Sequence, residues 1–166
     1  MVQIANTKTN ITNHISMEYK KVLDFYKNKS VFITGNTGFK GSWLTHMLLS
    51  AGAIVHGYGL RPLTTPSLFH IIGLDQLGEG DSLHQFYADV RDLEALKAAF
   101  ESSSPEIVFH LAAQPIVRDS YRDPVTTYST NVMGTVNVCE CVRTTVDENG
   151  QPVVKSLTSK IFMYLF

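Results

Sequence analysis

The sequence lacks the features that would direct a chain to a membrane, a disulfide framework or a nucleic acid. Its only two cysteines, Cys139 and Cys141, are too close for an easy disulfide and fall on different faces of the helix expected there. No stretch approaches the ~18 apolar residues of a membrane span, and the first residues lack a signal-peptide pattern. The net charge of -1 comes without a basic stripe. A reduced, cytoplasmic protein that binds neither nucleic acid nor membrane nor metal is therefore expected.

What the chain does have is enough apolar side chains for one hydrophobic core. Hydrophobic residues make up 44% of the sequence and charged residues 17%, and 166 residues are too few for two ordinary domains. The first residues are rich in Thr and Asn and show no apolar period, which predicts a polar extension over residues 1–28. One folded unit is expected to follow it.

Strand-like and helix-like patterns alternate along this unit. Short runs rich in β-branched and aromatic residues predict strands, whereas apolar residues three and four apart predict helices. Such alternation is typical of an α/β fold with a parallel sheet covered on both faces, because each crossover must pack on the sheet. Strands are expected at 30–34, 53–58, 83–88, 106–111 and 151–157, and helices at 18–27, 39–51, 67–77, 93–100 (capped by Asp92) and 125–146.

Three glycines, Gly35, Gly38 and Gly41, lie at a spacing of three between the first strand and the first long helix. In this context glycine permits the tight turn, the approach of a pyrophosphate to the backbone, and the close packing of helix and strand. The alternative is a turn without a ligand, which the flanking strand and helix make less favoured. An ATP-binding P-loop is rejected because it needs Gly immediately before Lys40, where Phe39 stands.

The segment TGNTGFKGSW at residues 34–43 resembles the extended short-chain dehydrogenase/reductase family, and within it the CDP-glucose 4,6-dehydratases. Further segments agree, and the resemblance covers about residues 29–154; most relatives have His where Asn36 stands. It implies a Rossmann-like doubly wound parallel sheet over residues 29–158, incomplete after its fifth strand. The agreeing segments are TPSLF at 65–69, FHLAAQPIVR at 109–118, SY at 120–121 and TYSTNVMGT at 127–135.

The resemblance also implies the residues of a cofactor and substrate site. The glycine turn is expected to hold the pyrophosphate, the end of the third strand the adenine, and the end of the fourth strand the cofactor and sugar. A surface charge, a helix-surface amide and a solvated arginine remain the alternatives for Asp89, Asn131 and Arg118. The cofactor contacts are Gly35, Asn36, Thr37, Gly38, Phe39, Gly41, Asp89, Val90, Leu111, Ala112, Ala113, Gln114 and Asn131, and the substrate contacts are Gln114 and Arg118.

The identity of the cofactor rests on the end of the second strand. An acidic residue there usually binds the ribose 2′-hydroxyl of NAD, but the sequence has Arg61 nearby instead. An arginine at this place can favour the 2′-phosphate of NADP, whereas the resemblance implies NAD. NAD is the cofactor chosen here, with NADP as the open alternative.

In the intact family, the resemblance implies conversion of CDP-glucose to CDP-4-keto-6-deoxyglucose through internal hydride transfer, in a homodimer formed by helices that include the 123–146 segment. This chemistry needs a Tyr with a nearby Lys, an orienting hydroxyl and an acid–base pair. Ser159 fits the hydroxyl, but no tyrosine has Lys four residues later.

Residues 159–166 are interpreted as an aberrant apolar tail, following a frameshift or premature stop near Lys155. The chain is thus expected to bind NAD without turnover. A nucleotide-sugar epimerase fragment and a non-catalytic dinucleotide-binding module are the alternatives.

Overall fold

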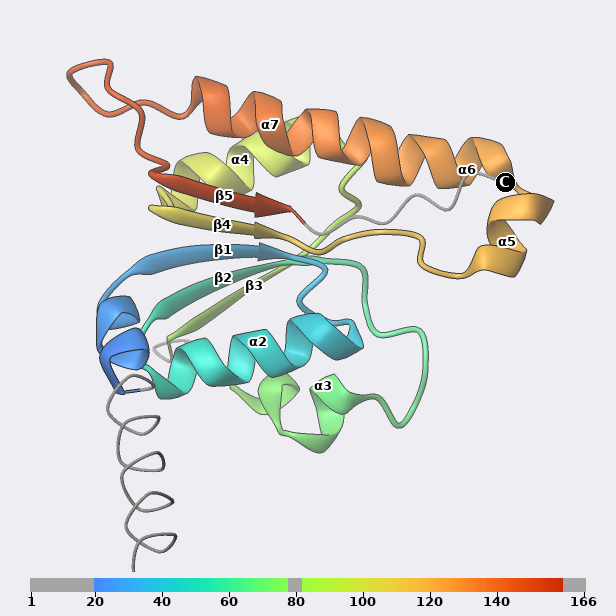
Figure 1. Cartoon of the computed structure of the whole chain (residues 1–166), viewed down its shortest axis with the longest axis horizontal. Helices are drawn as coiled ribbons and strands as arrows, with labels where there is room; N and C mark the ends of the chain where they lie inside the picture. The colour runs from blue at the N-terminus through green and yellow to red at the C-terminus, as the bar shows by residue number, and fades with distance from the viewer. Residues whose placement is uncertain (1–19, 78–81, 160–166) are drawn as a thin grey trace, which may run out of the picture.

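The computed structural model describes residues 20–77 and 82–159 of the chain. Within them, five parallel strands form one sheet in the order β3-β2-β1-β4-β5 (Figure 1). The first strand lies in the middle of the sheet, the next two extend it to one edge, and the last two extend it to the other edge. The strands are β1 (Ser30–Thr34), β2 (Ile54–Gly59), β3 (Leu83–Tyr87), β4 (Ile107–His110) and β5 (Ser156–Ser159).

Helices cover both faces of this sheet (Figure 1). On one face lie α2 (Phe39–Ser50) and α3 (Leu68–Ile71), the latter followed by the 3₁₀ turn η1 (Leu74–Gln76). On the other face lie α4 (Leu93–Ser103) and α7 (Gly134–Thr144). Between β4 and α7 the chain forms α5 (Val117–Arg122), α6 (Pro124–Tyr128) and the π-helical turn η2 (Ser129–Met133). Residues 20–26 are also helical.

Two apolar clusters pack on the two faces of the sheet, because successive strand side chains point in opposite directions. In β1, Val31 and Ile33 face α2, whereas Phe32 faces α4, and all three are fully buried. Because both faces of this central parallel strand are covered, its residues are apolar without alternation, as the sequence shows. The α2 cluster also contains Leu48, Val55 and Phe69, and the α4 cluster contains Tyr58, Leu96, Phe100, Val108 and Val138.

The expected fold class is confirmed, and four of the five expected strands agree with the structure to within one residue at either end. The fifth was expected at 151–157 but lies at Ser156–Ser159, because the preceding segment turns around Asp147, whose Oδ1 accepts from Asn149 N (2.9 Å) and Gln151 N (2.8 Å). Pro152 lacks the N–H of an interior ladder residue and forms only an isolated bridge with Val146.

The expected helices are also present, with three differences. The helix expected at 67–77 is divided at Gly73 (φ +73°) into α3 and the 3₁₀ turn η1. The helix expected at 125–146 is interrupted by the π turn η2, and α5 was not expected. Asp92 caps α4 as expected, accepting from Ala95 N at 3.0 Å. The expected extension and tail fall mostly on residues 1–19 and 160–166, outside the described residues. Among the described helices, none is long and apolar enough to cross a membrane.

Candidate dinucleotide-binding site

Most of the expected site residues follow the carboxyl ends of the strands. The order β3-β2-β1-β4-β5 places β1 beside β4, and the chain leaves these two strands in opposite directions across the sheet. In open α/β sheets, ligands bind in the crevice at this switch point. The glycine turn after β1 and the loop at residues 111–116 after β4 therefore flank the candidate site.

The glycine turn is shaped by close backbone contacts. Gly35 has φ +72°, and a Cβ there would lie 2.7 Å from Ala112 N; a Cβ on Gly41 would overlap the Gly35 carbonyl oxygen. Gly38 differs, because its φ is -75° and a Cβ would lie 3.4 Å from the nearest atom. Gly35 and Gly41 are thus needed for the fold, whereas Gly38 leaves open space at the surface of the turn.

Helix α2 begins immediately after Gly38, at Phe39. No side chain caps its amino terminus, and its first turn contains no acidic residue. The first N–H groups of a helix have no partner within the helix, and the helix dipole makes this end positive. This arrangement is a ready-made site for a phosphate or pyrophosphate.

Asn36 and Thr37 connect the turn to neighbouring strands. Asn36 is fully buried, and its Nδ2 donates to Gln85 Oε1 on β3 at 2.6 Å. The pair passes over Gly57, where a Cβ would collide with the Asn36 amide. Thr37 Oγ1 donates to the Leu60 carbonyl oxygen at 2.8 Å. Both side chains thus hold the turn against the end of β2.

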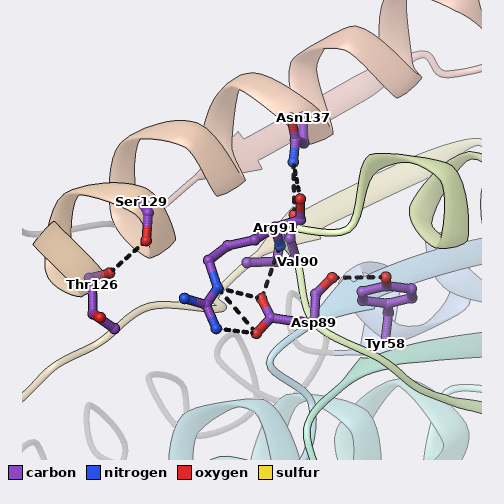
Figure 2. A network of polar contacts seen from close by, with 7 residues as sticks. All are labelled: Tyr58, Asp89, Val90, Arg91, Thr126, Ser129 and Asn137. Carbon is purple, nitrogen blue, oxygen red and sulfur yellow. Dashed lines mark hydrogen bonds and ion pairs between the residues drawn. The ribbon is translucent and has the colours of Figure 1, made fainter.

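The loop between β3 and α4 is held from the sheet side by Tyr58, whose hydroxyl donates to the Asp89 carbonyl oxygen at 3.0 Å (Figure 2). The Asp89 carboxylate pairs with the guanidinium of Arg91, at 2.6 Å between Oδ2 and Nη2. The hydrogen bonds from Arg91 lower the pKa of Asp89 from its ordinary value. Burial raises the pKa of Tyr58, so its hydroxyl keeps its proton.

The same loop is held from the helix side by Asn137 of α7. Its Nδ2 donates to the carbonyl oxygens of Val90 and Arg91, both at 3.1 Å (Figure 2). The Val90 side chain is buried against Gly134, where a Cβ would lie 2.7 Å from Val90 Cγ1. Because α7 passes so close, both the side chain and the carbonyl oxygen of Val90 are held against this helix.

Arg61 lies just beyond the end of β2, with its guanidinium carbon 4.2 Å from the centroid of the Tyr87 ring on β3. Such cation–π contacts hold an arginine without neutralising it. The last residue of β2 is Gly59 and the next is Leu60, so the acidic residue typical of this place is missing.

The loop after β4 is tied down at both of its ends. At its start, the N–H groups of Leu111 and Ala112 both donate to Thr34 Oγ1 at 3.2 Å. Further on, Asn131 Oδ1 accepts from Gln114 N at 2.7 Å, and Asn131 Nδ2 donates to the Gln114 carbonyl oxygen at 3.2 Å. Asn131 is a buried residue of η2 rather than a helix-surface amide. The loop geometry is therefore set by side chains of β1 and η2.

Residues 32–162 match the sequence profile of a family described as GDP-mannose 4,6 dehydratase. The chain belongs to this dehydratase family. It is 52% identical over 120 residues to the CDP-glucose 4,6-dehydratase of Salmonella typhimurium, with 72% of this chain and 32% of that protein covered. The resemblance expected from the sequence is thus confirmed.

Epimerases are also similar to this dehydratase-family chain. It is 36% identical over 124 residues to the UDP-glucose 4-epimerase of Mycolicibacterium smegmatis, covering 67% of this chain and 34% of that one. A solved structure of the UDP-glucose 4-epimerase of Thermus thermophilus in complex with NAD superposes with a TM-score of 0.57 at 27% identity, over 74% of this chain and 43% of that one. The chain spans about a third of the length of the curated relatives it matches.

The side chains of three expected site residues are exposed or folded back onto their own loop. Arg118 is exposed on α5. Ser159 is exposed at the end of β5, where it is in register with His110 of β4. The Gln114 side chain folds onto its own loop, donating to the Ile116 carbonyl oxygen and accepting from Ile116 N, both at 3.1 Å. Within the described ranges, no group of three His, Cys, Asp or Glu residues could hold a metal.

Sequence reasoning did not identify four residues that organise this site. Thr34, His110 and the half-buried Thr135 form a hydrogen-bonded chain beside the β4 loop, and Asn137 holds the β3 loop. His110 gave one signal in the sequence, a titratable side chain inside an apolar strand, immediately before the LAAQ segment. The other three are short polar residues, and their types alone do not distinguish them from surface positions.

Proposed function

We propose that this chain is the dinucleotide-binding part of a CDP-glucose 4,6-dehydratase and that it binds NAD. The observation that carries the proposal is the glycine turn at the sheet's switch point, opening onto the uncapped amino terminus of α2. The 52% identity to a protein named CDP-glucose 4,6-dehydratase supports the assignment to this substrate rather than to another nucleotide-sugar.

Each part of the site has one proposed task. The main-chain N–H groups of the first turn of α2 bind the pyrophosphate, with Gly38 allowing close approach. The loop at Asp89 and Val90 binds the adenosine end, and the loop from Leu111 to Gln114 contacts the nicotinamide and the sugar. When bound, NAD supplies the hydride acceptor for oxidation of a sugar hydroxyl.

Replacing Gly38 by alanine tests this assignment directly. Because φ is -75° and the added Cβ meets nothing closer than 3.4 Å, Gly38→Ala should fold normally while its methyl group obstructs the phosphate. Titration calorimetry of the full chain with NAD is expected to show a dissociation constant about tenfold higher in the variant. Ser50→Ala, at the other end of α2, is the control for a neutral change. Equal affinity in all three proteins would refute the proposed phosphate site.

NAD is proposed over NADP, although Arg61 makes a 2′-phosphate a serious competitor. The structural relative from Thermus thermophilus is an NAD complex, which supports NAD. Titration with NAD and with NADP in parallel decides the point, and Arg61→Ser should weaken any NADP binding while leaving NAD binding nearly unchanged. Tighter binding of NADP by the unaltered chain would overturn the NAD assignment.

We further propose that the chain does not turn over CDP-glucose by itself. No tyrosine in the sequence has a lysine four residues later, and the Ser159 hydroxyl has no such tyrosine to orient. Incubation with CDP-glucose and NAD, followed by mass spectrometry, is expected to show no loss of water from the sugar. A dehydrated product would show that the catalytic groups are present after all.

The second candidate is a nucleotide-sugar epimerase, favoured by the 36% identity to the UDP-glucose 4-epimerase of Mycolicibacterium smegmatis. Conversion of UDP-glucose to UDP-galactose in the same assay would support it over the dehydratase. A non-catalytic binding module is the third reading, and it predicts NAD binding with neither product.

A cytoplasmic homodimer is also proposed, through the exposed apolar face of α6, η2 and α7. Val125 is 77% exposed, Met133 51% and Val136 49%. Surface helices of globular proteins usually turn such apolar side chains toward a core. Sedimentation of the chain is expected to give twice the monomer mass. Val136→Lys should return it to a monomer, and the matched change Val146→Lys, beyond the end of α7, should not.

A further inference from the structure

His110 is fully buried at the carboxyl end of β4 and hydrogen-bonds through both ring nitrogens. Nδ1 lies 2.6 Å from Thr34 Oγ1 of β1, and Nε2 lies 3.1 Å from Thr135 Oγ1 of α7. The ring thus joins two adjacent strands to the long helix, next to the loop that faces the expected nicotinamide. None of the proposed cofactor contacts uses this side chain.

The partners of Thr34 determine which ring nitrogen carries the proton. A threonine hydroxyl has one proton and two acceptor sites. Thr34 Oγ1 accepts from the N–H group of Ala112 at 3.2 Å and from that of Leu111 at 3.2 Å, which Leu111 shares with the Thr34 carbonyl oxygen at 3.1 Å. Among the described contacts of Thr34 Oγ1, His110 Nδ1 is the one group that can accept the hydroxyl proton, so the imidazole proton resides on Nε2.

From His110 the hydrogen bonds continue in one direction. Nε2–H donates to Thr135 Oγ1, whose own proton goes to the Asn131 carbonyl oxygen at 2.6 Å. The Asn131 side chain then makes its two bonds to the main chain of Gln114, at 2.7 and 3.2 Å. Hydrogen bonds arranged head to tail strengthen one another where the local dielectric is low, and His110 and Asn131 are both buried.

We propose that His110 is a positioning residue that, as its Nε2–H tautomer, holds the π turn η2 in place through Thr135, so that Asn131 fixes the Gln114 loop of the cofactor site. The part of this inference that concerns the cofactor rests on the proposed NAD binding. Burial lowers the pKa of His110 to about 4, so the ring is neutral near pH 7. A neutral ring is required, because an imidazolium would present a second N–H to the Thr34 hydroxyl proton.

The alternative is that His110 is a core histidine whose two ring nitrogens are hydrogen-bonded but do not position the loop. In that case, substitutions at Thr135 and at Asn131 would affect the Gln114 main chain independently of each other. The relay predicts coupled effects, because Thr135 then acts on Gln114 only through Asn131. Coupling between two neighbouring residues is measured by a double-mutant cycle.

Nitrogen-15 NMR of the histidine rings in the full chain tests the tautomer directly. The expected spectrum for His110 shows a protonated Nε2 and an unprotonated Nδ1 at pH 7. A protonated Nδ1, or averaging between the two forms, would overturn the proposal. This measurement needs no cofactor, so its outcome is separate from that of the proposed NAD binding.

Hydrogen exchange of the Gln114 amide tests the relay. Thr135→Val removes the hydroxyl at nearly constant volume and is expected to speed exchange about fivefold, the loss of roughly one hydrogen bond. Thr135→Ser should restore the slow rate. Thr144→Val is the matched control, since Thr144 Oγ1 makes the same bond to the carbonyl four residues back, at 2.8 Å, on the same helix.

The cycle is completed in the Asn131→Ala background. There Thr135→Val should add nothing to the exchange rate of Gln114, whereas additive effects would refute the relay. In the NAD titration, Thr135→Val should weaken binding and Thr135→Ser should not. If the unaltered chain binds no NAD, the proposed function fails, while the tautomer and the exchange cycle still decide the role of His110.

Discussion

On the β1 side of the candidate site, main-chain atoms form the surface, whereas on the β4 side hydrogen bonds between distant side chains hold it. Gly35 and Gly41 are six residues apart, and they pack because neither has a side chain. The β4 loop depends on contacts such as Thr34 with His110, which are 76 residues apart in sequence. The phosphate end is therefore specified mainly within one short segment, against which Ala112 and Gln85 then pack, whereas the sugar end forms only once the whole sheet has assembled.

The largest loss of stability is expected from disrupting the main-chain packing on the β1 side. In Gly41→Val, the first atom of the new side chain would overlap the Gly35 carbonyl oxygen, and backbone cannot move aside cheaply. The free energy of unfolding should fall by about 3 kcal/mol or more, measured by urea denaturation. If Gly41→Val is as stable as Gly38→Ala, the close packing of turn and helix is not what requires glycine there.

A smaller loss of stability is expected from removing one of the long-range side-chain hydrogen bonds. Asn137→Ala removes the amide that donates to the carbonyl oxygens of Val90 and Arg91, at 3.1 Å each. Leaving these partly buried groups unpaired should cost about 2 kcal/mol and speed proteolysis of the β3–α4 loop. Asn149→Ala, in the exposed turn after α7, is the control. An unchanged cleavage rate in Asn137→Ala would mean that Tyr58 alone holds the loop.

Two histidines are buried among the described residues, and they allow the comparison to be made within one residue type. His110 has partners on both nitrogens, whereas His56 has a buried Nδ1 without a hydrogen-bond partner and stacks on His84 at 4.9 Å. Burial, and secondarily the charge of His84, lowers the pKa of His56 to about 4. Since the unfolded chain binds this proton from about pH 6.5 downward, stability should fall as the pH drops from 6.5 to 4.

Replacing His56 by leucine should make this acid sensitivity shallower and leave stability at pH 7 nearly unchanged, because the ring contributes no bond from Nδ1. Thermal unfolding at pH 7.5, 6.0 and 5.0 measures both quantities. His84→Leu, at the exposed partner of the stack, should change the slope less. An identical pH dependence in His56→Leu would show that His56 titrates normally in the folded chain.

The fold and the phosphate end of the site could be predicted because their determinants are local. Apolar periodicity marked the strands, and the spacing of Gly35, Gly38 and Gly41 marked the turn. The fifth strand was misplaced because apolar content alone does not reveal that Pro152 and the Asp147 turn precede it. The relay through His110 and Thr135 could not be predicted, because its members meet only after distant segments have packed.

The π turn η2 also fixes how the long helix can vary. A π turn contains one residue more than the α-helical turn it replaces, and each residue of an α-helix turns the chain by ~100°. Deleting one residue within Ser129–Met133 would therefore make the helix regular, yet would rotate everything before it around the axis. With the residue removed at Val132 or Met133, Asn131 would turn by ~100° relative to Thr135, and its side chain would leave the main chain of Gln114. The bond between Asn131 and Gln114 thus fixes the number of residues in this helix, and the loss of even one would break it.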